Sequence, residues 1–234
     1  MPHIKVGTVK TGLAECYGFC LYRPATGANA SKLYAFANDK TGAIEQWHLE
    51  AMAEGVTGTL VRRWSVKSQP EGMAADDEVR TLYLGEEKKG LWRFDADAND
   101  AGAKKDVVGT LVDEVKPKGL ITPDVEGIAI YRGKDGTGYV IVSAQGASEF
   151  LVYRREGKNP YVGTFAIAGT PTIDAVQESD GIEVTSAPLG ALFPFGAFVT
   201  QDGQSPGKNQ NFKVVGWDVI ARAFEPPLQI TPGK

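Results

Sequence analysis

The chain has 234 residues, of which 42% are hydrophobic and 23% are charged, and its formal net charge is −4 at pH 7. This composition predicts a folded protein with a large core and excludes a disordered chain, and the acidic balance argues against nucleic acid as a partner. No stretch approaches the ~18 apolar residues of a membrane-spanning helix, and the first residues, MPHIKVGTVK, lack the apolar region of a signal peptide.

An acidic residue close to a glycine recurs four times along the chain. The copies are Glu15, Glu71, Glu126 and Asp180, and they are separated by 56, 55 and 54 residues. A period in this range is typical of an array of similar supersecondary units. We call these four positions the anchors.

Each anchor is followed by short segments that are rich in Val, Ile, Tyr, Phe and Trp and bounded by Gly, Asn, Asp and Pro, which predicts strands and turns. The second segment of each repeat ends on a polar residue, the third contains an aromatic residue, and a poorer fourth segment closes three repeats. In chain order the predicted strands are 19–22, 33–40, 43–49 and 59–66, then 73–75, 81–87, 90–96 and 109–115, then 128–131, 138–146, 149–156 and 162–169, and finally 182–184, 196–203 and 211–219.

These repeats predict an all-β fold, a β-propeller of four-stranded blades. No linker rich in Ser and Gly separates the repeats, so we expect one domain over residues 1–234. The last repeat lacks a clear fourth strand, and residues 219–224 form at best a short helix. Residues 3–10 alternate like an outer strand without a blade. Either they complete the last blade of a four-bladed ring, or they end a blade that this chain does not contain.

Equivalent positions in propeller blades lie at equivalent heights around one axis, so the anchors and the polar ends of the second strands are expected at one mouth. Converging carboxylates repel one another unless a proton or a cation bridges them. Many oxygen ligands without a His or Cys cluster favour Ca²⁺ over zinc or copper. The same acidic-glycine steps also occur in ordinary β-turns, which leaves a purely structural interpretation open. Besides the anchors, the residues expected at this mouth are Asp39, Asp77, Glu86, Glu87, Asp124, Gln145, Asp174 and Asp202.

Other candidate residues receive structural interpretations. His3 and His48 stand alone without a paired ligand of metal-site spacing. Cys16 and Cys20 lie too far apart along an extended strand for a disulfide, so we expect free thiols. The third-strand aromatic residues are expected to pack between blades, and they are Trp47, Trp92, Tyr153 and Trp217.

Longer strings surround the anchors, in this order: ECYGFCLYR, SQPEGMAADDEVRTLYLGEE, DVEGIAIYRGKDGTGYVIVSAQG, SDGIEV, FPFGAFVTQDG and NQNFKVVGWDVIA. Together they resemble the β-propeller phytases, alkaline calcium-dependent phosphatases of inositol hexakisphosphate (phytate), over residues 12–224. The resemblance implies a cluster of Ca²⁺ ions at one mouth of a six-bladed propeller. There the ions would neutralise substrate phosphates, and a calcium-bound water would attack phosphorus.

The resemblance also implies roles for single residues. Ligands of the catalytic calcium cluster are implied at Glu71, Glu87, Asp124, Glu126 and Gln145. Ligands of a structural calcium ion are implied at Asp174 and Asp202. Tyr17 and Lys40 match groups that contact phosphate, and Glu15 lies in the shell around them. The implied catalytic set is therefore Glu71, Asp124, Glu126, Tyr17 and Lys40.

The chain departs from the family pattern in three ways. Thr41 stands where the family has an acidic residue after the phosphate-contacting lysine, and Ala175 replaces a glycine. The resemblance also begins partway into the family domain, so we expect a phytase domain that lacks its N-terminal third, with residues 3–10 ending a missing blade. An incomplete ring would expose apolar blade faces and promote self-association.

Three functions follow from these observations. The first is calcium-dependent hydrolysis of phytate or calcium phytate, and the second is a non-catalytic fragment that binds calcium and phosphate. The third is a scaffold whose repeats are structural only. The resemblance implies a secreted or periplasmic protein, although this chain shows no signal peptide.

Overall fold

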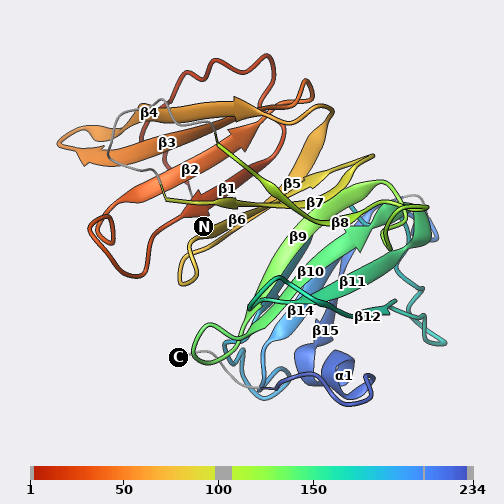
Figure 1. The fold of residues 1–234 in the computed structure, drawn as a ribbon. Helices are drawn as coiled ribbons and strands as arrows, with labels where there is room; N and C mark the ends of the chain where they lie inside the picture. The colour runs from red at the N-terminus through yellow and green to blue at the C-terminus, as the bar shows by residue number, and fades with distance from the viewer. Residues whose placement is uncertain (1–2, 98–106, 208, 231–234) are drawn as a thin grey trace. The chain divides into compact units, whose positions relative to one another are not determined.

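The structure, a computed structural model, describes residues 3–97, 107–207 and 209–230. These residues form fifteen strands in four sheets, one 3₁₀ turn and one short α-helix, which confirms the all-β prediction (Figure 1). No helix among them is long and apolar enough to cross a membrane.

Three sheets have four strands and the last has three, and each has its strands in simple sequence order. The first sheet contains β1 (Phe19–Tyr22), β2 (Leu33–Asn38), β3 (Ala43–Met52) and β4 (Gly55–Ser65). The second contains β5 (Pro70–Asp76), β6 (Thr81–Glu86), β7 (Gly90–Asp95) and β8 (Thr110–Glu114). The third contains β9 (Val125–Arg132), β10 (Gly138–Ala144), β11 (Glu149–Arg154) and β12 (Tyr161–Phe165). The fourth contains β13 (Ile182–Thr185), β14 (Ala197–Asp202) and β15 (Asn211–Gly216).

The chain divides into two compact units. Unit 1 comprises the described residues of Met1–Leu84 and Arg93–Thr110, and unit 2 comprises those of Gly85–Trp92 and Leu111–Lys234. The single domain over residues 1–234 stays a prediction.

Among the described residues the last sheet has three strands, in agreement with the expectation that the last repeat lacks a clear fourth strand. After β15 the chain turns at Gly216 into α1 (Trp217–Arg222), the helix expected near residues 219–224. Trp217 is fully buried and stacks on Tyr131 of β9, with ring centroids 4.1 Å apart. This contact joins the third and fourth sheets and confirms the packing role predicted for Trp217.

The N-terminal residues 3–10 lie beside the first sheet. The carbonyl of Val6 accepts a hydrogen bond from the N–H of Val56 in β4 at 3.0 Å. A Cβ atom on Gly58 would lie 2.7 Å from the Val9 side chain, so the two segments are in close contact. Residues 3–10 are therefore not the outer strand expected from their alternation, although within unit 1 they lie along the outer strand β4. Their relation to a missing blade stays a prediction.

Close approach of successive repeats explains the anchor glycines. A Cβ atom on Gly18 would lie 2.0 Å from the carbonyl oxygen of Glu71, and one on Gly127 would lie 2.5 Å from that of Asp180. Gly127 also donates its N–H to the Asp180 carbonyl at 2.7 Å. No side chain fits at either place, because the backbone of the next repeat already occupies it.

The strand register corrects the first anchor. Gly18 directly precedes β1, as Gly181 precedes β13, and both glycine carbonyls accept a hydrogen bond from the end of a second strand. The residue equivalent to Glu71, Glu126 and Asp180 is therefore Tyr17, and the assignment to Glu15 was wrong. Sequence spacing misled here because Glu15 is the nearest carboxylate to the glycine.

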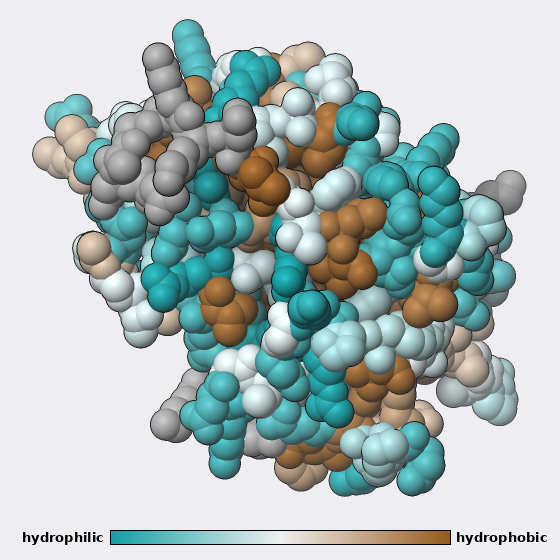
Figure 2. All heavy atoms as spheres, in the orientation of Figure 1, coloured by the Kyte–Doolittle hydropathy of each residue, from teal (hydrophilic) through white to brown (hydrophobic). Residues whose placement is uncertain are grey.

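Apolar side chains reach the surface at the end of unit 2. Phe212 and Val214 of β15 are 71% and 49% exposed, and Val219 of α1 is 62% exposed. Figure 2 shows apolar surface where Figure 1 draws α1. The predicted self-association through exposed blade faces stays a prediction.

Candidate active site

The first cluster of candidate site residues lies in unit 1, around Tyr17. Its hydroxyl donates to the Glu71 carboxylate at 2.8 Å, and the Lys40 ammonium lies 4.3 Å from the centre of its ring. Lys40 also approaches Glu15, with 3.7 Å between nitrogen and oxygen, and the two side chains are 45% and 61% exposed. An ion pair this exposed is weak. The Lys40 ammonium is therefore accessible to an anion from solvent while Tyr17 limits its position.

Backbone contacts fix this arrangement. The Asn38 side chain accepts a hydrogen bond from the N–H of Gly18 at 2.9 Å and donates one to the carbonyl of Glu71, also at 2.9 Å. The N–H of Tyr17 donates to the Asn38 carbonyl at 2.9 Å. One buried amide at the end of β2 thus positions both partners of the Tyr17–Glu71 hydrogen bond.

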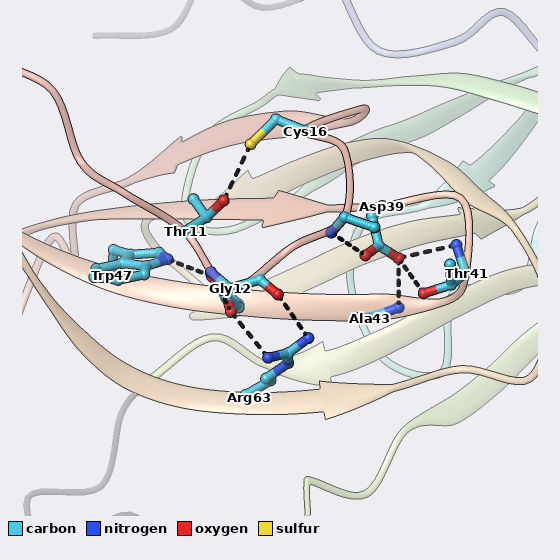
Figure 3. Close-up of polar contacts among 10 residues, drawn as sticks. Thr11, Gly12, Cys16, Asp39, Thr41, Ala43, Trp47 and Arg63 are labelled. Atoms are coloured by element: carbon cyan, nitrogen blue, oxygen red, sulfur yellow. Dashed lines mark hydrogen bonds and ion pairs between the residues drawn. The ribbon is translucent and has the colours of Figure 1, made fainter.

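The segment before Tyr17 is held to the first sheet by polar contacts (Figure 3). The buried Glu45 carboxylate accepts from the N–H of Gly12 at 3.1 Å and from the indole of Trp47 at 3.0 Å. Arg63 donates to the carbonyl of Gly12 at 3.1 Å. These contacts order a stretch that has no secondary structure of its own.

Asp39 has a structural role rather than the metal-facing one expected for a strand end. One of its carboxylate oxygens accepts hydrogen bonds from the Thr41 hydroxyl at 2.6 Å and from the N–H groups of Thr41 and Ala43, and the other accepts from Ala14 at 3.0 Å (Figure 3). Burial raises the pKa of Asp39, but these hydrogen bonds outweigh it and hold the pKa below its ordinary value. Thr41, the departure from the family pattern, serves this turn.

The second cluster of candidate site residues lies in unit 2 and contains two converging carboxylates. Glu87 and Glu126 each place a carboxylate oxygen within 4.8 Å of the other. The N–H of Val125 donates to the Glu87 carbonyl at 3.1 Å, which joins the end of β6 to the start of β9. Glu126 is only 4% exposed. Two carboxylates this close repel each other, so the pair favours a bridging cation or proton.

Gln145 is held by Asp124 and Asp180 of the same unit. Its N–H donates to the carbonyl of Asp124 at 3.0 Å, and its side-chain amide donates to the carboxylate of Asp180. A carboxylate only accepts hydrogen bonds, so the NH₂ of Gln145 must face Asp180 and its oxygen must point elsewhere. Gln201 in turn holds Asp180, whose N–H donates to the Gln201 amide oxygen at 2.8 Å.

Comparison with known proteins identifies the chain's relatives. A sequence profile of the family described as Phytase matches residues 5–232. The 3-phytase of Bacillus subtilis (strain 168) is 40% identical over 220 residues, which cover 92% of this chain and 55% of the relative. This chain belongs to the phytase family. It spans about half the length of the curated relative that it matches.

Solved structures support the fold of this phytase-family chain. The structure of U3-55K matches with a TM-score of 0.52 and 16% identity over 86% of this chain and 53% of that one. The WD40 repeats of RRP9 match with a TM-score of 0.51 and 17% identity over 86% of this chain and 52% of that one. WD40 repeats form β-propeller blades. At these identities the likeness shows the β-propeller fold alone.

The phytase-family ligands implied for a catalytic calcium cluster are distributed over both units. Glu71 belongs to unit 1, whereas Glu87, Asp124, Glu126 and Gln145 belong to unit 2. Their gathering at one mouth therefore stays a prediction. Within unit 2 the donors implied are hard oxygen atoms from three carboxylates and an amide, which is the ligand chemistry that Ca²⁺ prefers. These residues fit the group that the family implies.

The residues implied for a structural calcium ion, Asp174 and Asp202, fit that group less well. Both accept hydrogen bonds from the Lys213 ammonium, at 2.9 Å and 2.7 Å. A calcium ion at Asp174 and Asp202 stays a prediction, and the position between the carboxylates is filled by a side chain of this chain.

Sequence patterns missed two residues that position predicted site residues. In unit 1 Asn38 orients Tyr17, and in unit 2 Lys213 joins two predicted ligands. Asp180, which binds the side chain of Gln145, was predicted as an anchor. Its contact with Gln145 was not predicted. The expected free cysteines are confirmed, since Cys16 and Cys20 both have free thiols.

Proposed function

We propose that this chain carries calcium-dependent phosphomonoesterase chemistry directed at phytate. The observation that supports it most is the approach of the Glu87 and Glu126 carboxylates within 4.8 Å, in a chain whose curated relative is a 3-phytase. A pair of this kind attracts divalent cations, and a cation-loaded site attracts a polyanion such as phytate.

The chain's own residues have separate roles in this proposal. Glu87, Glu126 and the amide oxygen of Gln145 hold the cation in unit 2, together with Asp124. The family resemblance adds Glu71 to this ligand set, which stays a prediction. When bound, Ca²⁺ supplies positive charge that offsets the substrate phosphates and polarises water for attack on phosphorus.

Tyr17 and Lys40 bind and orient substrate. The Lys40 ammonium is 45% exposed, and a phosphate oxygen can replace its weak contact with Glu15. Tyr17 holds the Glu71 carboxylate through its hydroxyl at 2.8 Å, which limits the positions of both groups. Lys40 thus contacts phosphate directly, and Tyr17 fixes Lys40 and Glu71 relative to each other.

A second candidate function is that of a non-catalytic module that binds calcium and phosphorylated ligands. The observation that favours it is length, because the chain covers only 55% of the curated 3-phytase. Groups that grip phosphate in the whole relative need not be present in this chain. The two candidates share the same calcium ligands and differ only in turnover.

Release of inorganic phosphate from sodium phytate separates these candidates. The purified chain is assayed with Ca²⁺ and with EDTA, after near-UV circular dichroism has shown that it is folded. Release that EDTA abolishes supports the catalytic proposal. Binding of phytate in the presence of Ca²⁺ without release supports the binding module. Release that is unchanged by EDTA contradicts calcium dependence.

Export from the cytoplasm belongs to the same proposal. The family resemblance supports it, since proteins of this family are mostly exported. Fractionation of the producing cells, with the chain detected by antibody, tests it. Recovery from the cytoplasmic fraction alone would contradict this part of the proposal.

A further inference from the structure

Two carboxylates in the last repeat are joined by a lysine ammonium. The Nζ atom of Lys213 lies 2.9 Å from a carboxylate oxygen of Asp174 and 2.7 Å from one of Asp202. It also donates to the side-chain oxygen of Asn211 at 2.7 Å. An ammonium has three N–H donors, and here each finds an acceptor oxygen.

The site is enclosed and connects three segments. The Asp202 side chain is fully buried and that of Lys213 is 11% exposed. The second oxygen of Asp202 accepts from the N–H of Gln177 at 3.0 Å, and Asn211 donates to the Ser205 hydroxyl at 2.8 Å. The ammonium therefore ties the chain before β13 to the end of β14 and to β15.

The strand register explains why Lys213 reaches this place. In the β14–β15 ladder Asp202 pairs with Asn211, and Thr200 pairs with Lys213. Asp202 and Lys213 are diagonal neighbours on one face of the sheet, within reach of a long side chain. Its neighbours Phe212 and Val214 are the exposed residues of β15.

We propose that Lys213 is the built-in cation of the last repeat and takes the place of the structural calcium ion implied at Asp174 and Asp202. A calcium ion needs about six to eight oxygen ligands at about 2.3–2.6 Å. It would compete for the same carboxylate oxygens, and its charge would repel the ammonium between them. The stability of this repeat is then independent of Ca²⁺, even though the Glu87–Glu126 pair is proposed to bind it.

The proposal predicts a latent calcium site that opens when the ammonium is removed. Lys213→Met keeps the length and apolar character of the stem but removes the charge, and the exposed Lys158 gives a matched control, Lys158→Met. In EDTA, Lys213→Met is expected to lower the melting temperature by about 5 °C, and Lys158→Met to leave it unchanged. Ca²⁺ then restores the loss in Lys213→Met, and calorimetric titration finds one more bound Ca²⁺ than in wild type.

A second variant tests the wild-type state even if Lys213→Met fails to fold. Asp174 is 26% exposed, so Asp174→Asn is tolerated. The proposal expects this variant to bind as many Ca²⁺ ions as wild type and to gain as much thermal stability from them. A loss of one bound ion in Asp174→Asn would overturn the proposal. So would a folded Lys213→Met with unchanged melting temperature and no additional Ca²⁺. Both readouts are independent of phosphate release, so failure of the phytase proposal leaves them interpretable.

Discussion

Two pairs of carboxylates in unit 2 differ in what lies between them. The Lys213 ammonium contacts both Asp174 and Asp202, with its nitrogen 2.9 Å and 2.7 Å from their carboxylate oxygens. At Glu87 and Glu126, the defining contact is carboxylate to carboxylate, within 4.8 Å. The first pair holds a lysine ammonium of the chain, and the second, in our proposal, binds a cation from solution. The same residue chemistry thus serves stability in one repeat and, in our proposal, ligand binding in another.

The largest effect is expected at the second pair. Glu126→Gln removes one of two converging charges, so phosphate release from phytate should fall at least about 100-fold. The melting temperature in EDTA should stay the same or rise, because the variant relieves like-charge repulsion. Initial rates and melting curves measure both, and the exposed Glu225→Gln serves as control. Full activity of the Glu126→Gln variant would show that the Glu87–Glu126 pair is not needed for phosphate release.

The opposite outcome is expected at the first pair. Asp202→Asn leaves a largely buried ammonium without its closest carboxylate, which should cost about 2 kcal/mol of unfolding free energy. Phosphate release per folded molecule should stay within about twofold of wild type below the melting temperature. Urea unfolding and a rate assay test this pair of expectations. Loss of activity without loss of stability would break the distinction between the two regions.

The glycine after Glu126 allows a smaller and more local test. In Gly127→Ala the new methyl group would meet the Asp180 carbonyl, so unfolding free energy should fall by about 1–3 kcal/mol. Gly181→Ala is a matched control from the next repeat, because no atom lies within 4 Å of its added Cβ. Circular dichroism melts compare the two variants. Equal melting temperatures would show that repeat packing does not require Gly127.

The smallest effect concerns Asp39, whose carboxylate is used within a turn of unit 1. Because its pKa in the folded chain is lower than in the unfolded chain, the carboxylate contributes stability above its ordinary pKa of about 3.9 and loses it as the pH falls through the folded value. Asp39→Asn should therefore cost about 1 kcal/mol at pH 7 and progressively less toward pH 3. Urea unfolding at several pH values tests this, with Glu54→Gln as control. A pH-independent difference would contradict the role of charge.

Local patterns predicted the strands well because their signals are local. The segment 33–40 became β2 (Leu33–Asn38), and the segment 149–156 became β11 (Glu149–Arg154). Alternating apolar residues between turn residues suffice for such assignments. The spacing of anchors also led to the correct fold class.

Contacts that depend on strand register were less predictable. Tyr17 was assigned a substrate role by resemblance, but its equivalence with Glu126 follows only from the position of Gly18 before β1. Lys213 lies in the quoted string NQNFKVVGWDVIA, but nothing in the sequence pattern assigns it a role. Its partner Asp202 lies 11 residues away in sequence and becomes a neighbour only through the pairing of β14 with β15. Pairing the predicted strands explicitly would have brought the two together.

The inward orientation of Lys213 has a consequence for handling the protein. β15 is the last strand of its sheet, and charged side chains, especially lysines, normally protect such edges from joining another chain. Here the lysine of the strand is committed to Asp202, while Phe212 and Val214 face outward. Concentrated stocks should therefore aggregate through this edge first. Phe212→Lys or Val214→Lys should therefore reduce aggregation. Both positions are far in sequence from Glu87 and Glu126, the proposed cation ligands.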